Sequence, residues 1–170
     1  MKLTGHGLRQ NIRRRIAATS DRLARARYFR GHGVHSPFVY ALVREVFMRT
    51  ELLPGDRALY QVLRAAGTDE RRAVQLQNLA IHAGYATFGL NRADAAFSII
   101  TAELPRSEVL RLVHAAQETG ATVAILAPHA GIERQALCRQ IAAAHKSTSV
   151  DNRAYLLLFN NHLPEQHFRL

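Results

Sequence analysis

The sequence predicts an α/β fold with three layers, in which helices cover both faces of a small, mainly parallel sheet. Three observations support this prediction. Strand-like apolar runs alternate with helical segments between residues 95 and 161, the earlier half of the chain shows helical periodicity, and an Asp-Asn turn near the end joins two strands. Alternating strands and helices are typical of right-handed βαβ units with parallel strands. The turn adds an antiparallel C-terminal strand.

The chain begins with a basic helical region. Leu8, Ile12, Ile16, Leu23 and Ala26 fall on one stripe of a helix over residues 8–29, and most arginines lie off that stripe. An apolar stripe of this kind has to pack against another surface, which is the protein core, a partner subunit or a membrane. Gly31 and Gly33 end this helix.

Further helices follow. Ser36-Pro37 has the pattern of an N-cap and a first helical residue, which predicts a helix over about 37–49. Pro54-Gly55 is a turn, and helical stretches are expected over about 56–66 and 70–83. Residues 1–50 are therefore interpreted as a basic arm with a capped helix, and residues 51–170 as the α/β domain.

The second half supplies the strands. Apolar runs at 95–101 and 121–128 predict two strands, and the segments 105–120 and 131–145 predict helices, the first with Pro near its start and Gly after its end. Residues 147–161 predict a strand, a turn at Asp151-Asn152 and a last strand. We expect a reduced Rossmann-like sheet of roughly four to five strands, with an apolar face that a partner subunit covers.

The net charge of +10 is concentrated in the arm. Residues 1–33 hold nine Lys/Arg against one acid, which gives +8. This asymmetry predicts attraction to nucleic acid, anionic lipid or an acidic partner. The alternative is a solvated helix face in an arginine-rich proteome. The candidate polyanion-binding residues are Arg9, Arg13, Arg14, Arg15, Arg22 and Arg25.

Composition favours a soluble globular protein. Hydrophobic residues make up 48% and charged residues 21% of the 170. No apolar run approaches the ~20 residues that span a bilayer, and no secretory signal is present, so we expect no transmembrane segment and a cytoplasmic location. The single cysteine, Cys138, cannot form an intramolecular disulfide and is interpreted as a buried hydrophobe.

The sequence shows no catalytic constellation and no metal site. His32 and His35 are three residues apart, but no second pair has ligand spacing. Neither G-x-S-x-G nor a phosphate-binding glycine loop is present. Ligands of doubly wound sheets bind at the carboxyl ends of the strands, and there the chain offers Pro128-His129-Ala130 and the lone acid Glu103.

One stretch carries a family resemblance. "HGVHSPFVY" (32–40) resembles the N-terminal signature H-G-[IV]-H-S-P-F-V-[FY] of a group of bacterial class I SAM-dependent methyltransferases. Residues 94–170 are similar to the same group more loosely: strand, helix, strand, helix and a final strand pair precede "PEQHFRL", which looks like the group's E-H-F-x-L-R terminus. The resemblance implies a Rossmann-like α/β/α fold and an ancestor that transferred methyl groups from SAM.

The middle of the chain departs from that family. Its acidic, Gly-rich cofactor loop (E-L-G-T-S) is replaced by "ATFGLNRAD" (86–94), interpreted as a remnant of the first strand, and about two βα units are missing. The family's acidic pair after the next-to-last parallel strand is replaced by "LAPHA" (126–130). The only remnant cofactor-binding residues are Gly84, Gly89 and Asn91. No cofactor is expected, or SAM if activity is retained.

Three functions remain open. The first is a degenerate, non-catalytic methyltransferase-like protein that acts as a binding or assembly module, as a homo-oligomer or with a protein partner. The second is an active SAM-dependent methyltransferase completed by a partner chain. The third is a nucleic-acid-binding protein that uses the arginine arm, whose affinity falls steeply with salt. Binding of SAM or S-adenosylhomocysteine separates the first from the second.

Overall fold

The computed structural model describes residues 36–161 and 163–170. The predicted helix over 8–29, His32, His35 and the six candidate polyanion-binding arginines lie outside the described residues. In the described part, no helix combines the length and the apolar composition needed to cross a membrane.

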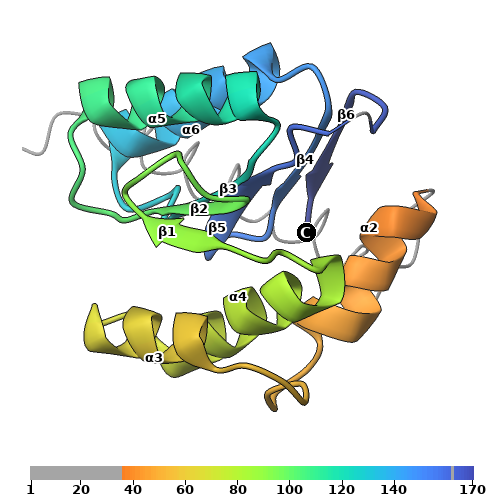
Figure 1. Ribbon diagram of the computed structural model, residues 1–170. Coiled ribbons are helices and arrows are strands. Elements are labelled where there is room, and N and C mark those ends of the chain that lie inside the picture. Colours follow the sequence, from red (N-terminus) through yellow and green to blue (C-terminus); the bar gives the residue numbers. More distant parts are fainter. Residues whose placement is uncertain (1–35, 162) are drawn as a thin grey trace, which may run out of the picture.

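A mixed six-stranded sheet forms the centre of the structure (Figure 1). Its order is β1-β2-β3-β5-β4-β6. Strands β1, β2 and β3 are parallel, β5 is antiparallel to both β3 and β4, and β6 is parallel to β4. The strands are Phe88–Leu90 (β1), Phe97–Ile100 (β2), Thr122–Leu126 (β3), Thr148–Asp151 (β4), Tyr155–Leu158 (β5) and Gln166–Arg169 (β6).

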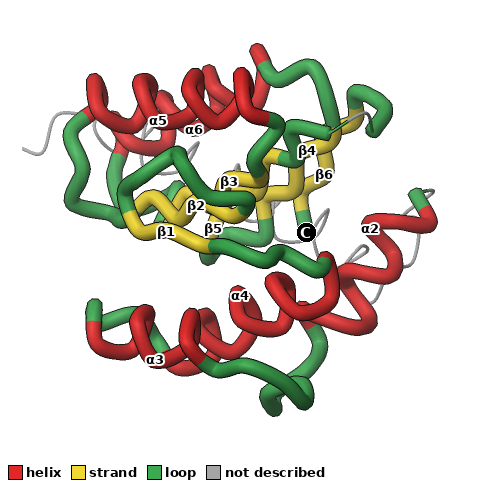
Figure 2. Tube along the Cα trace, in the orientation of Figure 1, coloured by secondary structure: helices red, strands yellow, loops and turns green. Residues whose placement is uncertain are grey.

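Helices lie on both faces of this sheet (Figure 2). One face carries α5 (Arg106–Thr119) and α6 (Ile132–Ala144). The other carries α3 (Ala58–Ala65), α4 (Glu70–Ala83) and the segment that begins with α2 (Pro37–Leu42) and continues as a π-helix, η1 (Val43–Phe47). The segment predicted over 37–49 is thus helical, but its second half has the wider π form.

Local signals place the helix ends. The Ser36 hydroxyl accepts a hydrogen bond from the Val39 N–H at 3.4 Å, and the Asp69 carboxylate accepts one from Arg72 N–H at 3.3 Å. Both are N-caps of the expected kind. Gly120 ends α5 with φ +74°, a conformation that an L side chain rarely adopts. The sequence therefore specifies where these helices stop and start.

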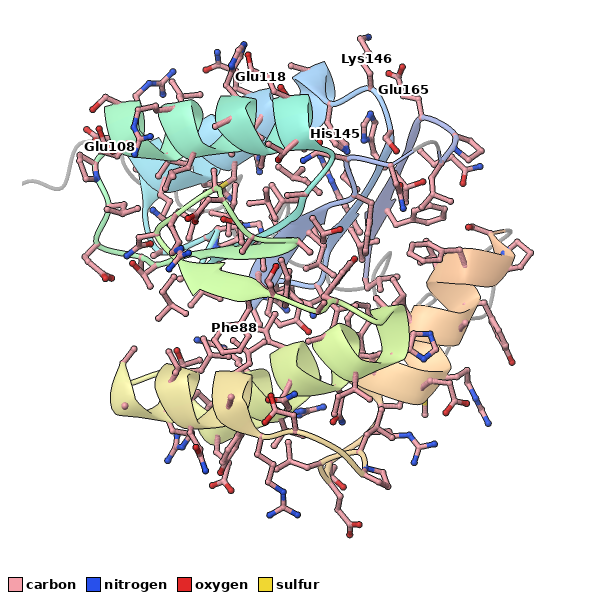
Figure 3. The ribbon with its side chains drawn as sticks, viewed as in Figure 1. Phe88, Glu108, Glu118, His145, Lys146 and Glu165 are labelled. Carbon is pink, nitrogen blue, oxygen red and sulfur yellow. The ribbon has the colours of Figure 1, made fainter. Side chains whose placement is uncertain are left out.

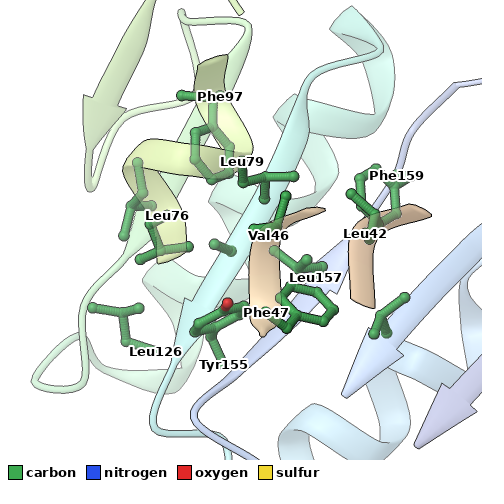
Figure 4. Packing of buried hydrophobic residues seen from close by; sticks show 14 of the residues in the cluster. Leu42, Val46, Phe47, Leu76, Leu79, Phe97, Leu126, Tyr155, Leu157 and Phe159 are labelled. Carbon is green, nitrogen blue, oxygen red and sulfur yellow. The ribbon is translucent and has the colours of Figure 1, made fainter. Parts of the chain in front are cut away.

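Charged side chains point away from the sheet and leave an apolar interior. Glu118, Lys146 and Glu165 are exposed at the outer surface (Figure 3). The interior contains two clusters, one on each face of the sheet. The larger joins α2, η1, α3 and α4 to the strands and includes, among others, Leu42, Val46, Phe47, Leu76, Leu79, Phe97, Leu126, Tyr155, Leu157 and Phe159 (Figure 4).

The structure confirms the mixed α/β class and the antiparallel strand after the Asp-Asn turn, which is β5. The strand predicted within 86–94 is present as β1. The expectation of four to five strands was wrong, because β6 adds a sixth. Its sequence, QHFR, lacks the apolar content of a buried strand, and most of its residues are exposed at the sheet edge. The chain therefore ends on a strand parallel to β4, beyond the antiparallel β5.

Candidate functional site

The carboxyl ends of β1, β2 and β3 form one edge of the sheet. In open α/β sheets this edge is where ligands bind. The residues that leave the three strands here are Asn91, Thr101 and Ala127, of which Asn91 and Ala127 have positive φ of 55° and 48°. A cofactor held in the manner of a doubly wound fold would have to contact these residues.

Asn91 joins the ends of β1 and β2. Its backbone N–H donates to the Ile99 carbonyl at 2.8 Å. Its side-chain Oδ1 accepts from the Thr101 N–H at 2.9 Å, and its Nδ2 donates to Thr101 Oγ1 at 2.7 Å. The polar atoms that a ligand would need at this point are therefore engaged within the chain.

Arg134 joins the ends of β2 and β3 by hydrogen bonds. Its side chain comes from the first turn of α6, and its Nη2 donates to the carbonyl of Thr101 at 2.9 Å and to that of Leu126 at 2.9 Å. These carbonyls belong to the residue after β2 and to the last residue of β3. A guanidinium carries several fixed donors, so one side chain satisfies both strand ends.

Gly84 and Gly89, the two other predicted cofactor-binding residues, lie away from the strand ends that Asn91 joins. Gly84 ends α4 with φ +70°, and no heavy atom lies within 4 Å of the position that a Cβ would take. The next residue, Tyr85, contacts Thr122 Oγ1 with its hydroxyl at 2.7 Å, which places this region at the amino end of β3. Gly89 lies within β1, where a Cβ would collide with the Arg92 side chain. Of the three predicted residues, only Asn91 stands at the carboxyl edge.

We expect Asn91→Ala to lower the free energy of unfolding by about 1–3 kcal/mol, because it leaves Thr101 without its partners and because alanine tolerates positive φ less well than asparagine. Asn91→Gly loses the same hydrogen bonds without the backbone strain and should be the less damaging change. Urea unfolding followed by circular dichroism measures both. Values within about 0.5 kcal/mol of the parent for both variants would show that this link contributes little.

The lone acid at this edge, Glu103, is exposed. The Thr101 hydroxyl lowers the pKa of its carboxyl, so the group is ionised at neutral pH. A carboxyl that acts as a general acid needs a raised pKa instead. Asp94, in the loop between β1 and β2, forms a surface ion pair with Arg92, with Oδ2 2.8 Å from Nη2. Neither carboxylate has the surroundings of a catalytic acid.

A second concave site lies between α6 and the strands β4 and β6. It is a cavity of about 180 Å³. Its walls include Cys138, Arg139 and Ala142 of α6 and Ser149, Asp151 and His167 of the two strands. Ser149 and His167 are register partners in the parallel β4–β6 pair, as are Asp151 and Arg169. Side chains of both pairs therefore point to the α6 face of the sheet.

A hydrogen-bonded chain crosses one end of this cavity. Both carboxylate oxygens of Asp151 contact His129 Nε2, at 3.1 and 2.9 Å, and the Gln135 Nε2 contacts His129 Nδ1 at 3.0 Å. Because an amide N–H donates, Nδ1 is the acceptor and the imidazole proton lies on Nε2, facing Asp151. The Asp151 carboxylate also accepts the Arg153 N–H at 2.8 Å.

The other histidine pairs with a hydroxyl. Ser149 Oγ lies 2.8 Å from His167 Nδ1, and His167 Nε2 lies 3.9 Å from a carboxylate oxygen of Glu165. Ser149 is 2% exposed, so its hydroxyl serves to fix the imidazole. Burial raises the pKa of the Cys138 thiol to about 11, which keeps it protonated and unreactive. The prediction that Cys138 is buried is confirmed.

Sequence patterns single out His129 at a strand end, but they give Asp151 only as a turn residue and do not single out Gln135. These two partners of His129 are 22 and 6 residues away in the chain, and His167 lies on the strand that was not predicted. The one available signal was the segment "LAPHA" (126–130) after β3, which puts a histidine at a strand end.

Within residues 36–161 and 163–170, no group of three or more His, Cys, Asp or Glu side chains is placed to hold a metal ion. Comparison of the chain with protein-family models, with curated proteins and with solved structures finds no significant match to any of them.

Proposed function

We propose that this chain is a degenerate, methyltransferase-like protein with a reduced Rossmann-like three-layer fold, which has lost catalysis and works by binding. The observation that carries this proposal is the closed carboxyl edge of the sheet. Asn91 and Arg134 there bond to the strand ends that would otherwise face a cofactor. The same groups cannot bond to a ligand without giving up these partners.

The composition of the loop after β1 also supports the proposal that the cofactor site has been lost. In the described part of the chain one strand, β1, precedes β2. The residues between them, NRADAA (91–96), contain no glycine, and their one acid is paired with Arg92. A methyltransferase of the family that the chain resembles has an acidic, Gly-rich loop at this place. The turn therefore lacks the glycine that would let its backbone N–H groups approach a cofactor closely.

The size of the cavity beside α6 agrees with this proposal. Pockets for drug-sized ligands and cofactors have volumes of about 300–1,000 Å³. The cavity here is about 180 Å³. SAM, with its nucleoside and methionine parts, exceeds that volume.

Isothermal titration of the full chain with SAM and with S-adenosylhomocysteine tests the proposal. We expect no binding heat for either ligand, while an active methyltransferase titrated with the same ligand stocks serves as the positive control. Micromolar binding of either compound would overturn the proposal and favour the alternative of a retained activity.

A protein that works by binding requires a macromolecular partner. A second copy of this chain is the simplest such partner. Ile132, at the start of α6, is 73% exposed, and Leu110 of α5 on the same side of the sheet is 37% exposed. Sedimentation velocity at increasing protein concentration is expected to show a mass above that of the monomer. A monomer at every concentration would leave a different protein as the partner to be sought.

A further inference from the structure

We propose that the cavity between α6 and the β4–β6 edge binds a phosphate group, either free phosphate or the phosphate of a small monoester. This site lies beside the carboxyl end of β3, since Pro128 and His129 line it, but its lining does not include Asn91, Thr101 or Arg134, and the inference does not rest on the proposed function. The cavity of about 180 Å³ matches a ligand of a few heavy atoms better than a cofactor.

Two arginines supply the charge. Arg139 comes from α6 and Arg169 from β6, so the two cations approach the cavity from opposite walls. Within the described residues neither guanidinium forms a hydrogen bond or ion pair. Both are therefore available to a ligand in the forked, two-donor geometry that suits phosphate oxygens.

The single carboxylate of the lining is already engaged. Asp151 holds the Nε2–H of His129 and the backbone N–H of Arg153. Its charge is thereby partly offset, while the two arginines of the lining form no ion pair among the described residues. With two arginines and one carboxylate in its lining, the cavity attracts an anion. Each planar guanidinium can donate two hydrogen bonds side by side, so the pair favours a dianionic phosphate over a single carboxylate.

The remaining polar groups are held in place. Ser149 fixes His167 through Nδ1, and Gln135 with Asp151 fixes His129. The two imidazoles thus present fixed edges to the cavity, and a binding site gains affinity when its groups need no reordering. Leu156, Ala142 and the buried Cys138 give the cavity an apolar floor, where bonds to an anion are weakened less by water.

The test is titration of the full chain with inorganic phosphate and, in parallel, with glycerol phosphate, at low ionic strength. Binding is followed by NMR through the imidazole resonances of the histidines. We expect saturable shifts of the His129 and His167 signals with at least one of the two ligands. Tighter binding of inorganic phosphate identifies the free ion as the ligand, and tighter binding of the ester identifies the monoester.

Paired variants separate this site from the basic arm over residues 1–33, whose charge is also expected to attract phosphate. R139Q/R169Q removes the two cavity cations, and we expect it to weaken binding by about tenfold or more, the effect of one lost charge-assisted hydrogen bond. The control R57Q/R71Q removes the same charge from exposed positions of the other helical face and should leave the affinity unchanged. Equal affinity in both double variants, or no histidine shifts with either ligand, would overturn the proposal.

Discussion

Tyr155→Ala is expected to lower the free energy of unfolding by about 3–5 kcal/mol, as for other large aromatic truncations in a core. The Tyr155 side chain is 0% exposed, on β5 in the middle of the sheet. Its ring packs against Phe47 with centroids 6.1 Å apart, and Figure 4 shows both rings among the aliphatic side chains of the larger cluster. Because small domains are stable by only about 5–15 kcal/mol, this variant should be close to unfolding at room temperature.

The hydroxyl of Tyr155 has a separate role. It donates to Gln75 Oε1 at 3.1 Å, and Gln75 Nε2 in turn donates to the Phe47 carbonyl at 2.8 Å. Burial raises the pKa of this phenol, so it remains a donor at every pH at which the protein is folded. Tyr155→Phe leaves Gln75 Oε1 buried without a partner, and we expect it to cost about 1–3 kcal/mol.

Urea unfolding monitored by circular dichroism measures both variants. Tyr40→Ala is the matched control, because Tyr40 is 46% exposed on α2, and we expect a change within about 0.5 kcal/mol. A loss below about 1 kcal/mol for Tyr155→Ala would contradict the packing described here.

His145→Leu is expected to raise the free energy of unfolding by about 1–3 kcal/mol at neutral pH, because it removes polar atoms that are buried without partners. His145 follows α6, is 1% exposed, and neither ring nitrogen has a hydrogen-bond partner among the described residues. Figure 3 shows it at the corner where Lys146 and Glu165 reach the surface. Leucine fills a similar volume without polar atoms.

The same residue sets a pH dependence. Burial lowers the pKa of His145 below its ordinary value of 6.5. The backbone of Phe159 and Thr148 opposes this shift but does not cancel it; His167 adds to the lowering, and Glu165 opposes it. The unfolded chain therefore binds a proton that the folded chain does not bind in the window just below pH 6.5. Stability should fall as pH drops from 6.5 towards the lowered pKa, and this contribution should be absent above pH 6.5.

Thermal unfolding of the parent, His145→Leu and the exposed-site control His82→Gln between pH 5 and 8 tests this pH dependence. We expect a shallower loss of stability below pH 6.5 in His145→Leu than in the other two proteins. Parallel pH profiles for all three would show that His145 does not titrate with unfolding.

Local patterns predicted most of the helices and the inner strands. Ser36-Pro37 located the start of α2, and Pro105 and Gly120 bracketed α5. Continuous apolar residues identified β3, whose five residues are all buried. These features depend on neighbours within one or two turns of the chain, which is why the sequence alone predicts them.

Features that depend on distant neighbours were missed. Gln75, Gln77 and Asn78 are buried on α4, although polar residues in a helix usually face solvent. They are buried because Asn78 bonds to both Leu53 N–H and the Glu51 carbonyl, and Gln77 accepts from Tyr60 N–H. The cavity lining was missed for the same reason: Ser149 meets His167 only through the parallel register of β4 and β6.

The place of β5 in the sheet governs when this protein can complete its fold during synthesis. β5 is the next-to-last strand along the chain, yet it lies between β3 and β4 and hydrogen-bonds to both. Until Tyr155–Leu158 has left the ribosome, the emerging chain holds the parallel strands β1, β2 and β3 and an unpaired β4, because the other partner of β4, β6, follows β5 in the chain. The edge of β3 and both edges of β4 are then free, so the nascent protein is more exposed to aggregation before β5 emerges than after it.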